Sequence, residues 1–310
     1  MAIPLQGSRF LRRVNRLIVS QSLYFWLRVL KFNRQILWTY NPMTMEFLRL
    51  TDFGKTVYHC VDDIKAQPDM PAKDIQAAEE QLVASCNVCF VTSLQLLENC
   101  RRINPDTHYF PNVADYRHFS KALSDETPLQ AALEQMPKPM IGFIGAISSY
   151  KVDFELIRSL GLAHPDWSIV MIGQVGEGDP HTDVSTLTGL PNIHLLGPRP
   201  YADLPSYLKA FDVAILPSNL NDYTRSMFPM KFFEYLAAGK PVVATDLHAL
   251  HPFRDFAYLA SDHGDFARGV EAALRGEGPD LERRLELAQQ QTYEQRTERM
   301  LQLIPGELLG

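Results

Sequence analysis

Short apolar runs bounded by turn residues alternate with longer helical patterns along most of this chain. Because this alternation is typical of βαβ units, it predicts an α/β fold with parallel sheets. The second half offers six strand candidates, enough for a complete doubly wound domain. They are Met140–Ile144, Ser168–Ile172, Asn192–Leu195, Asp212–Leu216, Pro241–Thr245 and Phe256–Leu259. Helices are expected between them near 153–163, 202–210, 229–238 and 264–275.

The first half is shorter and offers four strand candidates, two fewer than a six-stranded sheet needs. They are Gln35–Tyr40, Thr56–Cys60, Val88–Thr92 and Thr107–Phe110, with helices expected near 8–32, 43–50, 71–85 and 93–102. A four-stranded layer of this kind is expected to leave a sheet edge exposed.

A polar, proline-containing segment, 120–138, separates the two halves. We therefore predict an N-terminal domain over residues 1–130 and a C-terminal domain over residues 131–310. The tail, 280–303, is rich in Glu, Gln, Arg and Leu and is expected to form one or two helices that pack back toward the first domain.

The composition is that of a globular protein, since 46% of the 310 residues are hydrophobic and 21% are charged. The formal net charge of −6 argues against a nucleic-acid partner. Cys86 and Cys89 have CxxC spacing but lie at the entry to an apolar run, which favours a buried strand pair over a redox or metal pair.

Residues 1–35 differ from the rest because they hold seven basic residues and no acidic one. The basic residues are Arg9, Arg12, Arg13, Arg16, Arg28, Lys31 and Arg34. The stretch Arg9–Leu30 mixes arginines with apolar residues, so it predicts an amphipathic helix, either an outer helix with a solvated basic face or a helix on a membrane surface. Its apolar core is too short to span a bilayer or to act as a signal peptide. We expect a cytoplasmic protein, with peripheral attachment to the inner face of the membrane as the second interpretation.

Residues 229–245 form the most informative segment, a predicted helix followed by Gly239 and a buried strand. Lys231 and Glu234 are i, i+3 neighbours on the helix, and Arg225 lies in the preceding loop, Asn221–Phe228. Cations near a helix N-terminus favour binding of a diphosphate, and a glutamate one turn later can accept hydrogen bonds from ribose hydroxyls. The alternative is a surface ion pair without a ligand.

Other familiar nucleotide motifs are absent from the sequence. Gly54-Lys55-Thr56 is not a P-loop, because Arg49 stands where the first glycine is required. Gly173, Gly176 and Gly178 do not form GxGxxG, and no Asp-x-Asp pair occurs. We therefore expect neither a metal nor a separate cofactor.

A series of motifs over nearly the whole chain from Ile36 resembles the retaining glycosyltransferases of family 4, also called group 1, which have the GT-B fold. Within that family the likeness is greatest to teichuronic-acid and exopolysaccharide biosynthesis enzymes. The motifs are LWTYNP at 37–42, VYHCVDD at 57–63, FPNVAD at 110–115, IGFIGAI at 141–147, PDW at 165–167, NIHLLGP at 192–198, YADLP at 201–205, FDVAILP at 211–217 and the segment 229–245.

The resemblance implies two Rossmann-like doubly wound domains, with the sugar nucleotide held by the C-terminal one in the cleft between them. The N-terminal domain is expected to be incomplete, because the family's first strands have no counterpart here. Either the chain starts upstream of Met1, or it is a fragment, or part of the acceptor site has been lost.

By the same resemblance, Glu234 binds the donor ribose. Ser226 stands where the family has a glutamate that contacts the donor sugar, which leaves the sugar's identity open. Lys151 and the turn at Gly145 are expected to bind the diphosphate. The family's partner arginine is replaced by Ala146, and we expect Arg225 and Lys231 to supply that charge.

The resemblance also places Arg199 and Tyr201 at the nucleobase, where Tyr201 either stacks on a ligand or packs on Pro205. Asp62 falls where relatives carry a histidine near the transferred sugar. It is expected either to orient sugar or acceptor hydroxyls in catalysis, together with Arg225 and Lys231, or to cap the next turn. His59 and Asp63 are weaker candidates.

The function implied is metal-independent, retaining transfer of a sugar from a nucleoside-diphosphate sugar to a glycan or lipid-linked acceptor in bacterial surface polysaccharide synthesis. A UDP-sugar is favoured over a GDP-sugar as donor. One alternative is a sugar-nucleotide-binding protein whose catalysis is impaired by the truncation. Another is a GT-B sugar-nucleotide epimerase, whose catalytic carboxylates are not evident in the sequence.

Overall fold

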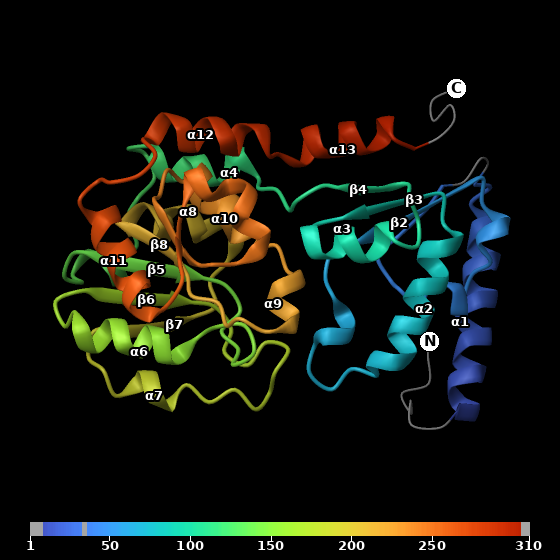
Figure 1. Ribbon diagram of the computed structural model, residues 1–310, viewed down its shortest axis with the longest axis horizontal. Coiled ribbons are helices and arrows are strands. Elements are labelled where there is room, and N and C mark those ends of the chain that lie inside the picture. Colours follow the sequence, from blue (N-terminus) through green and yellow to red (C-terminus); the bar gives the residue numbers. More distant parts are fainter. Residues whose placement is uncertain (1–8, 33–35, 305–310) are drawn as a thin grey trace. The chain divides into compact units, whose positions relative to one another are not determined.

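The computed structural model describes residues 9–32 and 36–304, with side chains from Val14 on. The chain divides into two compact units, which are described separately (Figure 1). The first runs to Phe110 and resumes at Arg299, and the second is Pro111–Glu298. The division therefore precedes the boundary at 130/131 that the sequence suggests. The reason is that Phe119, Ala122 and Leu133 are buried in the apolar core of the second unit.

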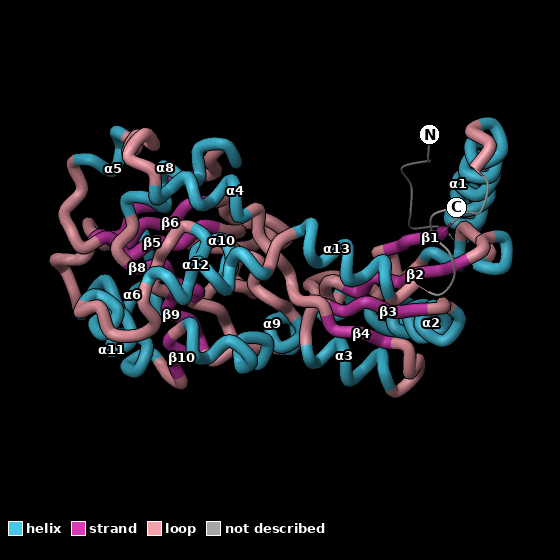
Figure 2. The backbone as a smooth tube through the Cα atoms, turned by 90° about the horizontal axis from the view of Figure 1, so that it is seen from above, coloured by secondary structure: helices cyan, strands magenta, loops and turns pink. Residues whose placement is uncertain are grey.

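The first unit contains a parallel sheet with the strand order β1-β2-β3-β4, as Figure 2 shows. Its strands are β1 (Ile36–Thr39), β2 (Lys55–Cys60), β3 (Val88–Val91) and β4 (Thr107–Tyr109). These are the four strands predicted from the sequence. Gln35, the first residue of the predicted strand 35–40, and Arg34, one of the basic residues of the N-terminal segment, lie outside the described residues.

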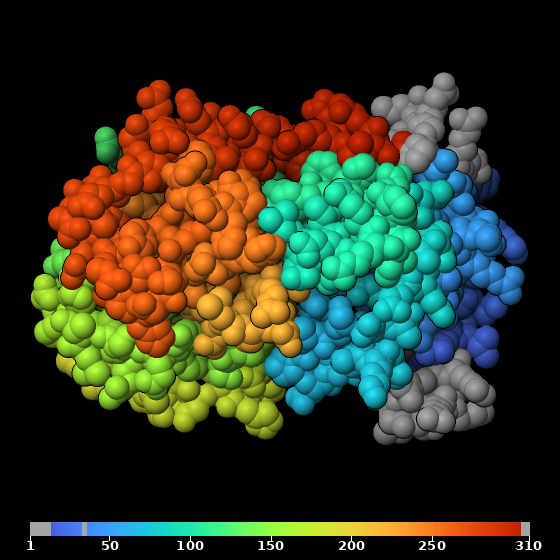
Figure 3. Space-filling view, viewed as in Figure 1, coloured from blue at the N-terminus to red at the C-terminus, as the bar shows by residue number. Residues whose placement is uncertain are grey.

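The helices of the first unit are α1 (Arg9–Val29), α2 (Ala72–Ser85) and α3 (Leu94–Arg101). Side chains of α2 and α3 pack with Tyr58, Cys60 and Cys89 on one face of the sheet. Figure 3 shows atoms of both helices, in cyan to teal, on the surface of this unit. The other face carries Val57, Val88, Phe90 and Phe110, which pack with Met300 and Ile304 from the C-terminal end of the chain.

The predicted buried pair of Cys86 and Cys89 is found as free thiols whose sulfur atoms are 3.2 Å apart. Cys89 lies on β3, whereas Cys86 caps the end of α2. The predicted helix over 43–50 is wrong: two 3-10 turns, Thr44–Glu46 and Leu50–Asp52, occupy this stretch. Asn41 favours the turn locally, because its side chain accepts a hydrogen bond from the Met43 amide at 2.9 Å.

The second unit has six parallel strands in the order β10-β9-β8-β5-β6-β7. They are β5 (Met140–Ile144), β6 (Ser168–Ile172), β7 (Ile193–Gly197), β8 (Val213–Leu216), β9 (Val242–Thr245) and β10 (Tyr258–Ala260), close to the predicted ranges. The chain winds outward from β5 in one direction and then from β8 in the other. The topological switch point of this doubly wound sheet therefore lies between β5 and β8.

Helices cover both faces of this second sheet (Figure 1). One face carries α6 (Phe154–Ala163), α7 (Ser185–Thr188) and α11 (His263–Leu274). The other face carries α4 (Tyr116–Phe119), α5 (Ala131–Glu134), α8 (Leu204–Ala210), α10 (Lys231–Ala237) and α12 (Leu281–Gln290). The tail forms two helices as expected, α12 and α13 (Tyr293–Gln302).

The segment 221–228, predicted as a loop, contains a short helix, α9 (Asp222–Ser226). Asn221 begins it with a capping box, accepting from the Thr224 amide while the Thr224 side chain accepts from the Asn221 amide. Across residues 9–32 and 36–304, no helix is long and apolar enough to cross a membrane. In the same residues, no three His, Cys, Asp or Glu side chains are grouped so that they could hold a metal ion.

Candidate functional site

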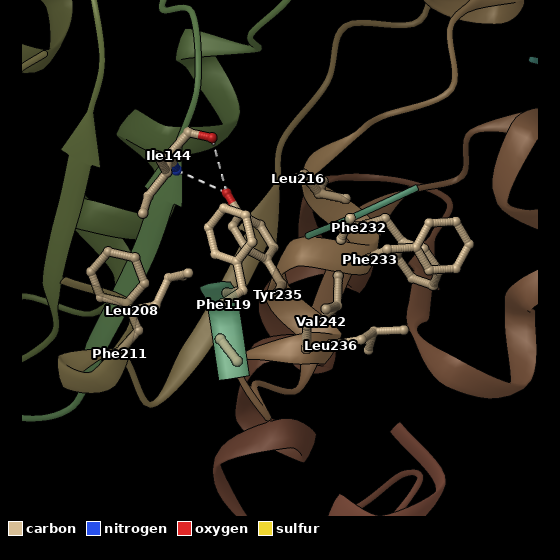
Figure 4. Packing of buried hydrophobic residues seen from close by; sticks show 14 of the residues in the cluster. Phe119, Ile144, Leu208, Phe211, Leu216, Phe232, Phe233, Tyr235, Leu236 and Val242 are labelled. Atoms are coloured by element: carbon tan, nitrogen blue, oxygen red, sulfur yellow. Dashed lines mark hydrogen bonds between the residues drawn. The ribbon is translucent and has the colours of Figure 1, made fainter. Parts of the chain in front are cut away.

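Tyr235 fixes α10 to the carboxyl end of β5. Its hydroxyl accepts a hydrogen bond from the Ile144 amide at 2.8 Å and donates one to the Ile144 carbonyl at 3.2 Å, as Figure 4 shows. Tyr235 is fully buried beside Phe232, Phe233 and Leu236. Glu234 precedes Tyr235 and Gly145 follows Ile144, so this contact holds both at the edge of the sheet where ligands of doubly wound domains bind.

Glu234 is a carboxylate held in a nearly dry position, with an exposed fraction of 5%. Its oxygens lie 3.1 and 3.4 Å from the Lys231 Nζ, which confirms that the two side chains share one face of the helix. Burial raises the pKa of Glu234 above its ordinary value, while the charges of Lys231 and His118 oppose that rise. A buried carboxylate whose ionised form is stabilised by a neighbouring cation is a strong hydrogen-bond acceptor for a neutral donor such as a hydroxyl.

The turn after β5 is held in place from the loop that follows β8, across the switch point. Asn219 Nδ2 donates to the Ser149 carbonyl at 2.7 Å, and Asn221 Nδ2 donates to the Tyr150 carbonyl at 2.7 Å. On its other side the Ser149 amide donates to Thr182 Oγ1 at 3.1 Å. The backbone of residues 145–151 is therefore preorganised by side chains from two other loops.

Lys151 lies at the end of this turn, between two aromatic rings. Its Nζ is 5.2 Å from the centre of the Tyr150 ring and 5.6 Å from that of Tyr223 on α9. These cation–π contacts restrain the ammonium group at the site edge without neutralising its charge. Lys151 is thus placed as a cation available to an anionic ligand.

Gly145 and Gly173 bring the ends of β5 and β6 into close contact. A Cβ on Gly173 would lie 1.7 Å from the Gly145 carbonyl oxygen, so this position accepts glycine alone. The Gly145 amide donates to the Ile172 carbonyl at 2.9 Å. Because residue 173 is a glycine, no side chain from that position covers the Gly145 backbone.

Arg225 and Ser226 lie on the last turn of α9. Arg225 is exposed, whereas Ser226 is buried with an exposed fraction of 3%. Asn112 Nδ2 donates to the Phe228 carbonyl at 3.0 Å and so fixes the link from α9 to α10. The short helix α9 thus holds Arg225 and Ser226, two predicted site residues, just before the fixed link to α10.

The chain leaves β7 through Gly197, whose φ of +73° suits glycine, and continues to Arg199 and Tyr201. The Arg199 guanidinium lies 5.7 Å from the centre of the Tyr207 ring on α8. The Tyr201 ring stacks on His118, with centroids 4.3 Å apart and planes at 13°, rather than packing on Pro205 alone. His118 Nε2 is also 2.9 Å from the Tyr201 carbonyl oxygen.

Tyr201 retains 52% exposure despite this stacking. Burial is the main cause that raises its pKa to about 12, followed by the charges of Glu234 and Asp115. His118 lowers the pKa of Glu234, and Glu234 in turn raises the pKa of Tyr201, so the three side chains belong to one neighbourhood. Gly145 and Lys151 therefore follow the carboxyl end of β5, Tyr201 follows that of β7, and Ser226, Lys231 and Glu234 follow that of β8.

Several residues of this site were missed by the sequence reasoning, namely His118, Tyr150, Asn219, Asn221 and Tyr223. One signal was available for Asn221, since an Asn three residues before a Thr predicts a helix N-cap. No sequence signal pairs His118 with Tyr201, because 83 positions separate them.

Asp62 lies in the first unit, two residues after β2, and is partly exposed. Its carbonyl accepts a hydrogen bond from the Ile64 amide at 3.1 Å. Asp63 is 8% exposed and pairs with Lys65 at 2.7 Å, so it has a structural partner. His59 is 1% exposed, with its ring 4.9 Å from that of Tyr40 and 6.0 Å from that of Trp38. Of these three, Asp62 is the residue that is not buried.

Comparison with known proteins shows which family and which folds this chain is similar to. Residues 138–276 match the family Glycosyl transferases group 1. A protein of Bacillus subtilis (strain 168) named as the teichuronic acid biosynthesis glycosyltransferase TuaH is 33% identical over 178 residues. The match covers 56% of this chain and 44% of that protein, so the chain spans less than half the length of this curated relative.

Two solved structures are similar over almost the whole chain, each at 16% sequence identity. Sucrose-phosphate synthase from Thermosynechococcus elongatus has a TM-score of 0.72 and covers 98% of this chain, with 81% of its own chain covered. HepE from Anabaena, solved in complex with UDP and glucose, has a TM-score of 0.74, with 97% and 84% covered. The fold is thus confirmed as the GT-B fold. Residues 138–276 of the second unit are the part of the chain that matches the group 1 family.

Proposed function

We propose that this chain is a glycosyltransferase, moving a sugar from a UDP-sugar to a glycan or lipid-linked acceptor in bacterial surface polysaccharide synthesis. The observation that carries the proposal is Glu234, buried and paired with Lys231 at the switch point of a group 1 glycosyl transferase domain. A buried carboxylate at this position has a direct use if ribose hydroxyls donate to it, because such charge-assisted hydrogen bonds are strong.

The donor would be bound entirely by the second unit. Glu234 accepts hydrogen bonds from the ribose, and Lys151, Lys231 and Arg225 supply positive charge to the diphosphate. Gly145 lets the diphosphate approach the backbone. Tyr201 and Arg199 flank the nucleobase, and Ser226 contacts the donor sugar. The three cations come from three different segments, so the diphosphate would be surrounded rather than touched from one side.

The chemical step requires little covalent help from the protein. As the bond between the anomeric carbon and the diphosphate oxygen breaks, negative charge grows on the phosphate oxygens. Preorganised cations such as Lys231 stabilise that charge, and losing one such donor costs about 3 kcal/mol of barrier, or roughly 100-fold in rate. Because these cations are fixed in advance, we propose metal-independent catalysis.

The acceptor hydroxyl would attack from the same face as the leaving group, which gives retention of configuration. We propose that Asp62, the partly exposed carboxylate after β2, orients sugar or acceptor hydroxyls in this step. The enzyme would work in the cytoplasm, peripherally on the inner face of the membrane that carries a lipid-linked acceptor.

The preference for a UDP-sugar over a GDP-sugar is supported by a similar fold. The Anabaena protein HepE, with a TM-score of 0.74, binds UDP and glucose. A small uracil ring also needs only one stacking surface, such as the half-exposed ring of Tyr201.

The experiment is thermal unfolding of the full chain with UDP, GDP or ADP at 100 times the dissociation constant, where binding adds about 2.7 kcal/mol. We expect UDP to raise the Tm by several degrees. Glu234→Gln should reduce the shift to about a third or less, while Glu155→Gln, an exposed glutamate on α6, should keep it in full. If the folded protein shows no shift with any nucleoside diphosphate, or Glu234→Gln keeps the full shift, the proposed donor site is wrong.

A further inference from the structure

All four cysteines of the chain lie in one buried cluster of the first unit, where the sheet packs against α2 and α3. They are Cys60 on β2, Cys86 at the C-cap of α2, Cys89 on β3 and Cys100 on α3. Each of them is a free thiol. No step of the proposed transfer reaction uses a thiol, so the cluster holds nucleophiles that this reaction leaves without a role.

Cys86 and Cys89 are the two thiols that the fold places for bond formation. Their sulfur atoms are 3.2 Å apart, so they need to approach by about 1.2 Å to reach a disulfide bond of about 2.05 Å. Both residues lie where the chain turns from α2 into β3. Burial of the pair is what the sequence predicts, whereas contact between the two sulfur atoms is a finding of the structure.

The side chain of Asn104 holds the two thiols from one side. Its Nδ2 lies 3.7 Å from Cys86 Sγ and 4.0 Å from Cys89 Sγ. The same nitrogen donates to the Val83 and Cys86 carbonyls at 3.0 and 3.1 Å, which fixes the amide at the end of α2. Because Asn104 is itself buried, with an exposed fraction of 9%, it is a preorganised donor that favours a thiolate in the pair.

Cys86 is the thiol that is suited to react first. A hydrogen bond with Cys89 is the main cause that lowers the pKa of Cys86; burial opposes this effect and Asn104 supports it. The helix dipole disfavours an anion at this end of α2, so the hydrogen bonds are what favour the thiolate. Cys86 is also 7% exposed, against 0% for Cys89, and it lies between the exposed residues Ser85 and Asn87. Since the thiolate is the form that attacks a disulfide, Cys86 is the nucleophile of the pair.

The other two cysteines of the cluster are in the opposite electrostatic state. Cys60 and Cys100 are hydrogen-bonded to each other, which is the main cause that raises the pKa of Cys60 well above its ordinary value, followed by burial and the charge of Glu79. Cys60 Sγ donates to Glu79 Oε1 at 3.5 Å, and a carboxylate beside a thiol keeps the thiol protonated. Because a protonated, buried thiol is inert, Cys60 and Cys100 serve as an internal control.

We propose that Cys86 and Cys89 are a redox-active dithiol, which a small-molecule disulfide such as oxidised glutathione converts into an intramolecular disulfide. Cys86 Sγ attacks one sulfur of the external disulfide, forms a mixed disulfide and releases one thiolate. Cys89 Sγ then attacks Cys86 Sγ and releases the second thiolate. The protein gives up two protons and two electrons, which the external disulfide takes up to become two thiols. The product ties the end of α2 covalently to β3.

The test is incubation of the full, folded chain with oxidised glutathione, followed by alkylation of the remaining thiols in denaturant and peptide mass spectrometry. We expect a bridge between Cys86 and Cys89, with Cys60 and Cys100 alkylated. Dithiothreitol should restore all four thiols. Cys89→Ser should stop the reaction at the mixed disulfide on Cys86, whereas Cys86→Ser should slow modification of Cys89 by about tenfold or more. Cys100→Ser, in the same cluster, is the matched control and should leave the bridge unchanged.

Calorimetry of the oxidised protein gives a second measurement that needs no variant. A bridge between groups that the fold already holds together should raise the Tm of the unit that contains it by a few degrees, and dithiothreitol should reverse the rise. The absence of a Cys86–Cys89 bridge in the folded protein would overturn the inference. So would a bridge between Cys60 and Cys100 instead, oxidation that requires unfolding, or a lower Tm after oxidation.

Discussion

The strands of the second unit run outward in both directions from the β5–β8 pair, whereas those of the first unit follow chain order from β1 to β4. Loops that leave two adjacent strands toward opposite faces open a crevice at their carboxyl ends, and the described first unit has no such point. This difference explains why residues from distant parts of the sequence, such as Tyr201 and Glu234 or Lys151 and Tyr223, lie near one another in the second unit. The first unit offers instead Asp62 after β2 and the thiol pair of Cys86 and Cys89.

The largest expected effects come from the two apolar cores. Phe90 on β3 and Phe232 on α10 are each fully buried, so Phe90→Ala and Phe232→Ala should each cost about 3–5 kcal/mol. If the units fold separately, calorimetry will show that Phe232→Ala lowers the transition that UDP raises and Phe90→Ala lowers another. A single transition that both variants lower equally would show that the two units are one cooperative body.

The next largest effect separates binding from stability at Glu234. Glu234→Gln should weaken UDP binding by roughly 30–100-fold, because a charged hydrogen-bond acceptor contributes about 2–3 kcal/mol. Its Tm without ligand should be unchanged or higher, since burial makes the ionised carboxylate costly in the folded state. Isothermal titration and a melting curve measure the two quantities. A large loss of stability would instead identify the Lys231–Glu234 pair as mainly structural.

The raised pKa of Glu234 predicts that both stability and UDP binding depend on pH. Burial raises the pKa of Glu234, so the folded protein binds this proton more tightly than the unfolded chain, and the group's contribution to stability is lost as pH rises through the folded pKa. UDP binding needs the ionised form of Glu234 and should therefore weaken as pH falls. Because the pKa is raised, this weakening should begin at a higher pH than it would for a glutamate of ordinary pKa. Titrations of UDP between pH 4 and 8 check this, with Glu234→Gln lacking the transition. An identical pH profile in that variant would assign the dependence to another group.

A smaller effect is expected at the contact between α10 and β5. Tyr235→Phe removes the hydroxyl that serves both the amide and the carbonyl of Ile144, at a cost of about 1–3 kcal/mol. UDP affinity should fall several-fold because Glu234 and Gly145 lose their common anchor. Tyr258→Phe, which removes a hydroxyl bonded to Asp265 away from this contact, is the matched control. Unchanged affinity in a destabilised Tyr235→Phe protein would mean that the anchor serves the fold alone.

The smallest effect concerns the ring pair at the edge of the site. His118→Ala removes the ring stacked on Tyr201, and such pairs contribute about 0.5–1.5 kcal/mol. UDP binding should weaken about two- to tenfold. Because the lost contacts are those with the nucleobase, the affinity for pyrophosphate should be unchanged. His164→Ala, whose ring stacks on Trp167 at 3.7 Å, is the control. Equal losses for UDP and pyrophosphate would place His118 outside the nucleobase contact.

The sequence was sufficient for the strands and for α10, because apolar periodicity and turn residues are local signals. It located Lys231 and Glu234 on one helix face for the same reason. It failed at 43–50, where the side chains of Asn41 and Tyr24 satisfy backbone amides that a helix would have used. It also failed for His118 and for the asparagines that clamp the turn after β5, since these contacts join residues 70 or more positions apart. Tertiary contacts of this kind leave no periodic pattern in one sequence.

The central claim is that UDP binds at the switch point of the second unit, and hydrogen–deuterium exchange with and without UDP tests it most directly. We predict slower exchange at 145–151, 197–201 and 219–236, and unchanged exchange in β1 to β4. Protection that is instead confined to the cavity of about 640 Å³ at the amino end of β9, lined by Pro241, Phe256 and Arg283, would contradict the account.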